Sequence, residues 1–268
     1  MLNDLTFGQY YDSHSLLHRL DPRTKMIVLV LGVVFLFLAN TFWSILWAAV
    51  GVFLVVLLSK VPFGMYLKNL KVIVPILLFT AVINTLYTAS GTELFHFWFI
   101  HVTTGGLYRA FFMAFRILLL ILFSSVLTYT TTPNALTDAI ENLFGFLKIF
   151  GLQNAVHSLA MMMTIALRFI PTLVEEAQKI MNAQKARGAD LESGKLMDRV
   201  RALIPILIPL LISSVRRAYE LAEAMECRCY HGGEGRTRMK QLKYSSLDLF
   251  AGLFSVVFLA GIVVLNFL

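Results

Sequence analysis

The sequence has little charge for its length. Only 15% of its 268 residues are Asp, Glu, Lys or Arg, whereas 58% are hydrophobic and the mean hydropathy is +0.74. A soluble domain carries about 25% charged residues, so this chain has too few to cover a surface that faces water. Disorder is excluded too, because disordered segments combine low hydrophobicity with high charge. The composition predicts an all-α, polytopic membrane protein.

Other missing features exclude further classes. A membrane β-barrel needs alternating segments of about ten residues, whereas the apolar runs here are continuous. The two cysteines, Cys227 and Cys229, are too close in sequence for an unstrained bridge, so we expect no disulfide framework. We also expect no secretory signal peptide, because the first apolar run starts only at Met26 and no small-residue cleavage site follows it.

The apolar runs predict five transmembrane helices. A span needs about 17–25 mainly apolar residues. The uncharged run Met26–Ser59 is too long for one span and fits two short ones, broken at Asn40-Thr41. The expected spans cover about residues 26–40, 42–59, 70–88, 107–130 and 246–268. The first four would form an N-terminal membrane domain over residues 1–130, and the fifth a final transmembrane helix over 246–268.

The distribution of Lys and Arg predicts the orientation of these spans. Basic residues precede the first span and follow the second, and the segment 131–245 holds 15 of the 23. The turn at residues 40–41 and the loop 88–106 hold none. Because basic loops stay on the cytoplasmic side, we expect a multi-pass protein with its N-terminus in the cytoplasm and its C-terminus outside. The net charge of +7 is then explained first by the orientation of the spans, and only second does it suggest binding to nucleic acid.

Residues 131–245 are expected to form a cytoplasmic insert of three amphipathic helices, over about 133–149, 156–187 and 196–228. Pro133 suits the first position of a helix, and apolar residues recur at helical spacing along the first two segments. Pro171 predicts a kink in the second helix. The apolar run Leu203–Ile212 of the third is too short for a span. We expect the last two helices to lie at the membrane surface or against a partner.

The second and third of these helices look like a diverged repeat. After a shift of 41 residues, Arg187 aligns with Arg228. Each helix ends in an arginine between two small residues: Ala186-Arg187-Gly188 and Cys227-Arg228-Cys229. Small flanks leave a guanidinium accessible, and an exposed arginine can form a bidentate pair with a carboxylate. A simpler explanation stays open, because arginine near a helix C-terminus also stabilises the helix dipole.

Parts of the chain resemble a known family. Residues 8–10 and 15–25 are similar to the start of the transmembrane T component of energy-coupling factor (ECF) transporters, which are ABC-type importers of vitamins and metal ions. Residues 166–188 resemble that family more closely, and residues 127–133 also match. The chain departs at Tyr11-Asp12, where Pro-Gly is frequent in the family, and in the second tripeptide, where Ala and Gly are common instead of Cys.

The resemblance implies a non-catalytic coupling subunit in the cell membrane of a prokaryote. T components connect two cytoplasmic ATPase subunits to a substrate-binding membrane protein, the S component, and the arginine of each tripeptide docks in a groove of one ATPase. Carried over by position, the docking residues are Arg187 and Arg228 with their flanks Ala186, Gly188, Cys227 and Cys229. The implied contacts with the S component or the other coupling helix are Met161, Met162, Met163, Leu167, Ile170, Pro171, Leu207 and Leu211.

No cofactor is expected on the chain itself. The Walker A pattern G-x-x-x-x-G-K-[ST] is absent from the sequence, so ATP and Mg²⁺ would be bound by the partner ATPases. Cys227, Cys229 and His231 are tightly spaced and no fourth ligand is evident, which disfavours a metal site.

A second functional class is a stand-alone secondary transporter or a membrane-embedded enzyme. A secondary transporter should carry several ionisable residues at the bilayer midplane, but only Arg116 is expected there. Arg116 is either a functional intramembrane charge or a structural pair. An enzyme should show clustered His, Asp or Glu near the spans, whereas His96 and His101 stand in the outer loop. The run Met161–Met163 forms either ordinary apolar packing or an adaptable partner surface.

Overall fold

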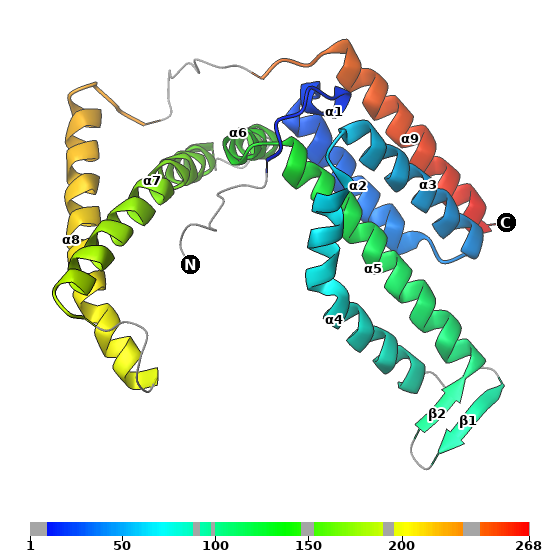
Figure 1. Cartoon of the computed structure of the whole chain (residues 1–268). Coiled ribbons are helices and arrows are strands. Elements are labelled where there is room, and N and C mark those ends of the chain that lie inside the picture. Colours follow the sequence, from blue (N-terminus) through cyan, green and yellow to red (C-terminus); the bar gives the residue numbers. More distant parts are fainter. Residues whose placement is uncertain are drawn as a thin grey trace. The chain divides into compact units, whose positions relative to one another are not determined.

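The computed structural model describes residues 10–87, 92–97, 100–145, 153–189, 196–232 and 242–267. These residues form nine helices and one two-stranded sheet (Figure 1). The helices are α1 (Leu16–Arg19), α2 (Pro22–Leu38), α3 (Phe42–Ser59), α4 (Phe63–Tyr87), α5 (Thr104–Thr130), α6 (Pro133–Leu143), α7 (Gln153–Ala186), α8 (Leu196–Glu226) and α9 (Ser246–Phe267). The strands are β1 (Glu93–Phe97) and β2 (Ile100–Thr103).

Six helices in the described part of the chain are long and apolar enough to cross a membrane: α3, α4, α5, α7, α8 and α9. The chain is therefore a multi-pass membrane protein. This set differs from the five expected spans. It leaves out α2, which has 17 residues, and it includes α7 and α8, which we expected outside the bilayer. Length and composition alone do not separate a membrane span from a long amphipathic helix.

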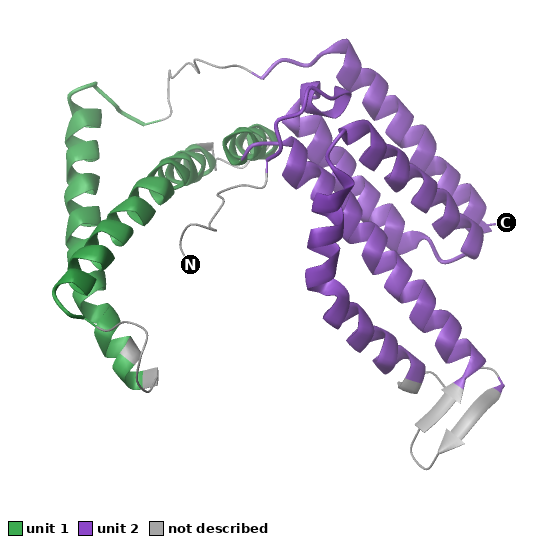
Figure 2. Ribbon diagram, in the orientation of Figure 1, with its two compact units in different colours: residues 1–7, 133–240 green, residues 8–132, 241–268 purple. Residues whose placement is uncertain are grey.

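The chain divides into two compact units, shown in separate colours in Figure 2. What we call the first unit is purple and keyed as unit 2 in the figure, and it contains residues 8–132 and 241–268. What we call the second unit is green and keyed as unit 1, and it contains residues 1–7 and 133–240. Helices α1–α5 and α9 and the two strands belong to the first unit, and helices α6–α8 belong to the second. The second unit is thus inserted in the sequence between α5 and α9.

The core of the first unit lies where α2, α3, α5 and α9 pack together. Two glycines let aromatic rings come very close to the helix backbone. A Cβ atom added at Gly32 would lie 2.4 Å from the ring of Phe123, and one at Gly51 would lie 2.2 Å from the ring of Phe258. Small residues at such contacts are typical of packed membrane helices, because they allow close approach.

Capping side chains explain where α2 and α3 begin. The carboxylate of Asp21 accepts a hydrogen bond from the Arg23 N–H at 2.9 Å, as is usual for an N-cap residue. Thr41 and Ser44 form a capping box at the start of α3. The turn between the two helices therefore falls at the expected break, residues 40–41.

The loop between α4 and α5 corrects the all-α prediction. Strands β1 and β2 pair in an antiparallel hairpin, with Glu93 opposite Thr103 and His96 opposite His101. Aromatic and β-branched residues, of which this loop has several, favour strands over helices. The prediction holds for the helices and is wrong for this short segment.

In the second unit α7 packs against both α6 and α8. The Nδ1 atom of His157 lies 3.1 Å from the Oε1 atom of Glu141, which joins the first turns of α7 to α6. On α7, the carboxylate of Glu176 accepts hydrogen bonds from the hydroxyl of Ser213 and from Arg217 on α8, the latter at 2.7 Å. Polar contacts thus fix α7 to each neighbour.

Candidate functional site

The end of α7 has the hydrogen bonds of a Schellman motif. The Ala189 N–H donates to the Gln184 carbonyl at 3.0 Å, and the Gly188 N–H donates to the Lys185 carbonyl at 3.0 Å. Gly188 has a φ angle of +88°, which is the left-handed conformation that this motif requires and that glycine adopts without strain. Arg187 directly precedes this residue, and its side chain is exposed.

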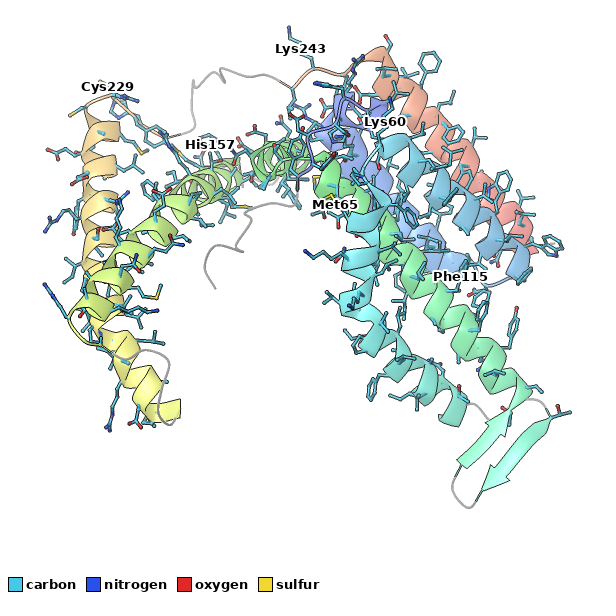
Figure 3. All side chains as sticks on the ribbon, in the orientation of Figure 1. Lys60, Met65, Phe115, His157, Cys229 and Lys243 are labelled. Carbon is cyan, nitrogen blue, oxygen red and sulfur yellow. The ribbon has the colours of Figure 1, made fainter. Side chains whose placement is uncertain are left out.

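The end of α8 has the same hydrogen bonds. The Tyr230 N–H donates to the Met225 carbonyl at 3.1 Å, and the Cys229 N–H donates to the Glu226 carbonyl at 2.9 Å. Cys229, which Figure 3 labels at this end of α8, has a φ angle of +53°. Arg228 directly precedes it and is exposed.

The two helix ends are therefore one local structure repeated 41 residues apart. In each, an arginine is the last residue before a left-handed turn. The small residues on either side of both arginines are exposed as well: Ala186, Gly188, Cys227 and Cys229. An exposed guanidinium between small residues can enter a groove and form a bidentate pair with a carboxylate.

The two arginines lie at opposite ends of an antiparallel helix pair. Near the end of α7, the Nε2 atom of Gln184 donates to the carbonyl of Pro205 at 3.4 Å. Beyond the end of α8, the hydroxyl of Tyr230 donates to the sulfur of Met161 at 2.9 Å. Met161 and Arg187, which directly follows α7, are 26 positions apart in the sequence, which corresponds to about 39 Å of helix at 1.5 Å per residue.

The predicted contact residues on α7 and α8 are mostly exposed apolar side chains. Met162, Met163, Pro171, Leu207 and Leu211 are exposed, whereas Met161, Leu167 and Ile170 are half-buried. The exposed apolar surface of α8 also includes residues that the sequence analysis did not predict as contacts, namely Leu203, Ile204, Ile208, Ile212 and Val215. Apolar surface of this extent requires lipid or a protein partner to cover it.

Arg116 is buried in the first unit and holds the turn between α2 and α3. Its Nη2 atom donates to the carbonyl of Ala39, the C-cap of α2, and to the Oδ1 atom of Asn40 at 3.2 Å. Its guanidinium carbon lies 5.2 Å from the centre of the Phe112 ring. A cation is favourable at a helix C-terminus and over an aromatic face. The guanidinium thus has hydrogen-bond partners at this turn, and a functional role of this charge stays a prediction.

Asn266, in the last turn of α9, binds the same turn and was missed by the sequence analysis. Its Nδ2 atom donates to the Leu38 carbonyl at 3.1 Å, and its Oδ1 atom accepts from the Asn40 N–H at 3.0 Å and from the Thr41 hydroxyl at 3.2 Å. The sequence feature that could have pointed to Asn266 is that it is a polar residue near the end of an otherwise apolar span.

Cys227 and Cys229 are free and exposed. Across the ranges that the structure describes, no three His, Cys, Asp or Glu side chains are grouped so that they could hold a metal ion. That the chain binds no cofactor of its own stays a prediction.

Similarity to known proteins extends over the whole chain. The family model described as "Cobalt transport protein", CbiQ, matches residues 13–239. The energy-coupling factor transporter transmembrane protein EcfT of Ruminiclostridium cellulolyticum is 48% identical over 267 residues, which cover 100% of this chain and 99% of that protein. EcfT of Acidaminococcus fermentans is 50% identical over 268 residues, covering 100% and 98%. EcfT of Bacillus subtilis is 47% identical over 250 residues, covering 92% and 93%.

Proposed function

Because this chain belongs to the CbiQ family, as a transmembrane (EcfT) component of energy-coupling factor transporters, we propose that it is the non-catalytic coupling subunit of an importer for vitamins or other micronutrients. Two cytoplasmic ATPase subunits bind it at Arg187 and Arg228. A substrate-binding S component contacts the exposed apolar faces of α7 and α8. ATP and Mg²⁺ are bound by the ATPases, and this chain transmits their movement to the S component.

The repeated arginine-bearing helix end is the observation that carries the proposal. Two ATPase subunits of similar structure need two similar attachment points, and α7 and α8 end in the same hydrogen-bonded turn with an exposed arginine. Because the helices are antiparallel, the attachment points are separated by about 39 Å of helix, which leaves room for a separate ATPase at each. The free thiols of Cys227 and Cys229 are small enough to allow the same close approach as Ala and Gly.

The proposal places α7 and α8 in the cytoplasm and makes α2, α3, α4, α5 and α9 the five spans. The chain then lies in the cell membrane of a prokaryote, with its N-terminus inside and its C-terminus outside. Arg168, in the middle of α7, supports this placement, because a charged side chain at the centre of a bilayer is costly.

The test is to purify the tagged chain from its native membrane in mild detergent, with and without the double substitution Arg187→Glu and Arg228→Glu. We expect two Walker-containing ATPases and at least one small membrane protein to co-purify with the wild type. We expect the double variant to lose the ATPases, because removing one partner of a buried charged pair costs about 2–5 kcal/mol.

The matched control is Arg216→Glu, which reverses the charge of an exposed arginine on α8 about 18 Å of helix before Arg228. This variant should keep the ATPases. Retention of both ATPases by the double variant would contradict the proposed docking. A wild-type chain that purifies alone and transports a solute in liposomes would contradict the coupling function itself.

A further inference from the structure

Besides the small residues that flank each arginine, the two arginine-bearing ends differ at the residue that follows the left-handed turn. After Gly188 this residue is Ala189, whose methyl group has no hydrogen-bonding atom. After Cys229 it is Tyr230, whose half-buried side chain donates a hydrogen bond from its hydroxyl to the sulfur of Met161 at 2.9 Å. The end of α8 is therefore tied by a side chain to α7, and the equivalent residue at the end of α7 cannot form such a bond.

Met161 lies at a position of α7 that is itself held. His157 precedes it by one helical turn, near the start of α7 in Figure 3, and pairs with Glu141 of α6 at 3.1 Å. Met162 and Met163, which directly follow it, are exposed. Tyr230 thus connects the arginine-bearing end of α8 to the part of α7 that presents the methionine surface.

A second contact between the helices lies farther along α7. Glu176 binds Ser213 and Arg217 of α8, about 22 Å of helix away from Met161. Gln184, near the end of α7, also donates to the Pro205 carbonyl of α8. With these two contacts alone, the end of α8 could move without moving the start of α7. With Tyr230 bound to Met161 as well, the end of α8 is also fixed to the start of α7. A displacement of Arg228 is then passed on to Met161.

We propose that Tyr230 is a positioning residue that transmits movement of the Arg228 end of α8 to Met161–Met163 on α7. This inference rests on the proposed function, because it requires an ATPase at Arg228. It makes the two ATPase attachments unequal. The ATPase at Arg187 acts on the end of α7 directly, whereas the ATPase at Arg228 acts on the start of α7 through Tyr230.

The test uses the complete complex of this chain with its two ATPases and an S component in lipid nanodiscs. Hydrogen–deuterium exchange is measured with and without ATP plus vanadate, which traps the ATPases in one state. In the wild type we expect the exchange of residues 223–232 and of residues 157–165 to change on trapping. In Tyr230→Ala we expect residues 223–232 to respond as before and residues 157–165 to lose their response.

Two conservative variants separate the hydrogen bond from the packing of the ring. Tyr230→Phe removes the hydroxyl, and Met161→Leu removes the sulfur at similar volume. Each should reduce the response at residues 157–165, and combining them should add little, because they break the same contact. The matched control is Tyr219→Ala, which removes a tyrosine that is 73% exposed on α8 and should leave both responses unchanged.

Three outcomes would count against the role of Tyr230. An unchanged response at residues 157–165 in Tyr230→Ala would show that Tyr230 is not the connection. Loss of an ATPase from Tyr230→Phe would assign the hydroxyl to docking and would also overturn it. If the wild-type complex contains no ATPase, the proposed function fails before any variant is compared.

Discussion

At the scale of single residues, the turn that ends α7 and the turn that ends α8 each require a left-handed backbone at the residue that follows the arginine. Gly188 and Cys229 both have a left-handed backbone, with φ angles of +88° and +53°. This conformation costs a residue with a Cβ atom about 1–2 kcal/mol. No atom lies within 4 Å of a Cβ placed at Gly188, so a substitution there would be opposed by the backbone conformation and not by a clash.

We therefore predict opposite effects for two substitutions at equivalent positions. Gly188→Ala should lower the free energy of unfolding by about 1 kcal/mol, and Cys229→Gly should raise it by about 0.5–1 kcal/mol. Cys227→Gly is the control, because residue 227 does not have a positive φ. Glycine at this position should therefore lower the free energy of unfolding by about 0.5–1 kcal/mol. Thermal unfolding of the purified chain in detergent measures all three. A destabilising effect of Cys229→Gly would contradict the assigned turn.

The sequence locates some of these residues and not their partners. Arg187 and Arg228 could be found because their small flanks repeat at a fixed spacing. Arg116 could be found because a charge within an apolar run is unusual. Its main partner is the carbonyl of Ala39, 77 residues earlier, and every residue has a carbonyl. Residue types therefore carry no signal for such a contact, and only the packing of α5 against α2 reveals it.

At the scale of whole elements, the apolar runs predict where helices lie but not where they end. Helix α4 begins at Phe63, several residues before the expected span at about residue 70. Lys68 and Lys71 interrupt the apolar run without interrupting the helix, since lysine is a good helix former and can extend its amine to the interface. The end of α6 at Leu143 falls short of the expected residue 149, and residues 146–149 lie outside the described ranges.

The hydrogen bonds of Asn266 to the turn between α2 and α3 support a prediction at this scale. Asn266→Leu should lower the free energy of unfolding by about 1–3 kcal/mol, because it removes one bond to each of three groups of that turn. The matched control is Asn84→Leu on α4, because within the part of the chain that the structure describes Asn84 donates to the Thr80 carbonyl of its own helix and not to another helix.

Thermal unfolding of both variants in detergent measures the difference. Equal destabilisation by Asn266→Leu and Asn84→Leu would mean that the last turn of α9 does not hold the first unit together. A larger loss of unfolding free energy for Asn266→Leu would show that this polar residue stabilises the packing of three helices, although it makes its own span less apolar.

At the scale of the whole molecule, two topologies compete. If α7 and α8 are cytoplasmic, the chain has five spans. If every candidate span crosses the bilayer together with α2, it has seven. Both topologies put the N-terminus and Cys229 on the inside and the C-terminus on the outside. They differ at the connection between α7 and α8, which is inside with five spans and outside with seven.

Labelling one residue with a membrane-impermeant maleimide therefore decides between them. In a chain expressed without ATPases and carrying Cys227→Ser and Cys229→Ser, we expect Ala189→Cys to react in inside-out vesicles and not in right-side-out ones. Thr92→Cys in the same background should react from the opposite side, and the native cysteines only from the inside. Reaction of Ala189→Cys from the outside would place Arg187 and Arg228 on opposite sides of the membrane. Two cytoplasmic ATPases could not then bind both, and other contacts would have to offset the free-energy cost of burying Arg168, at the middle of α7, in lipid.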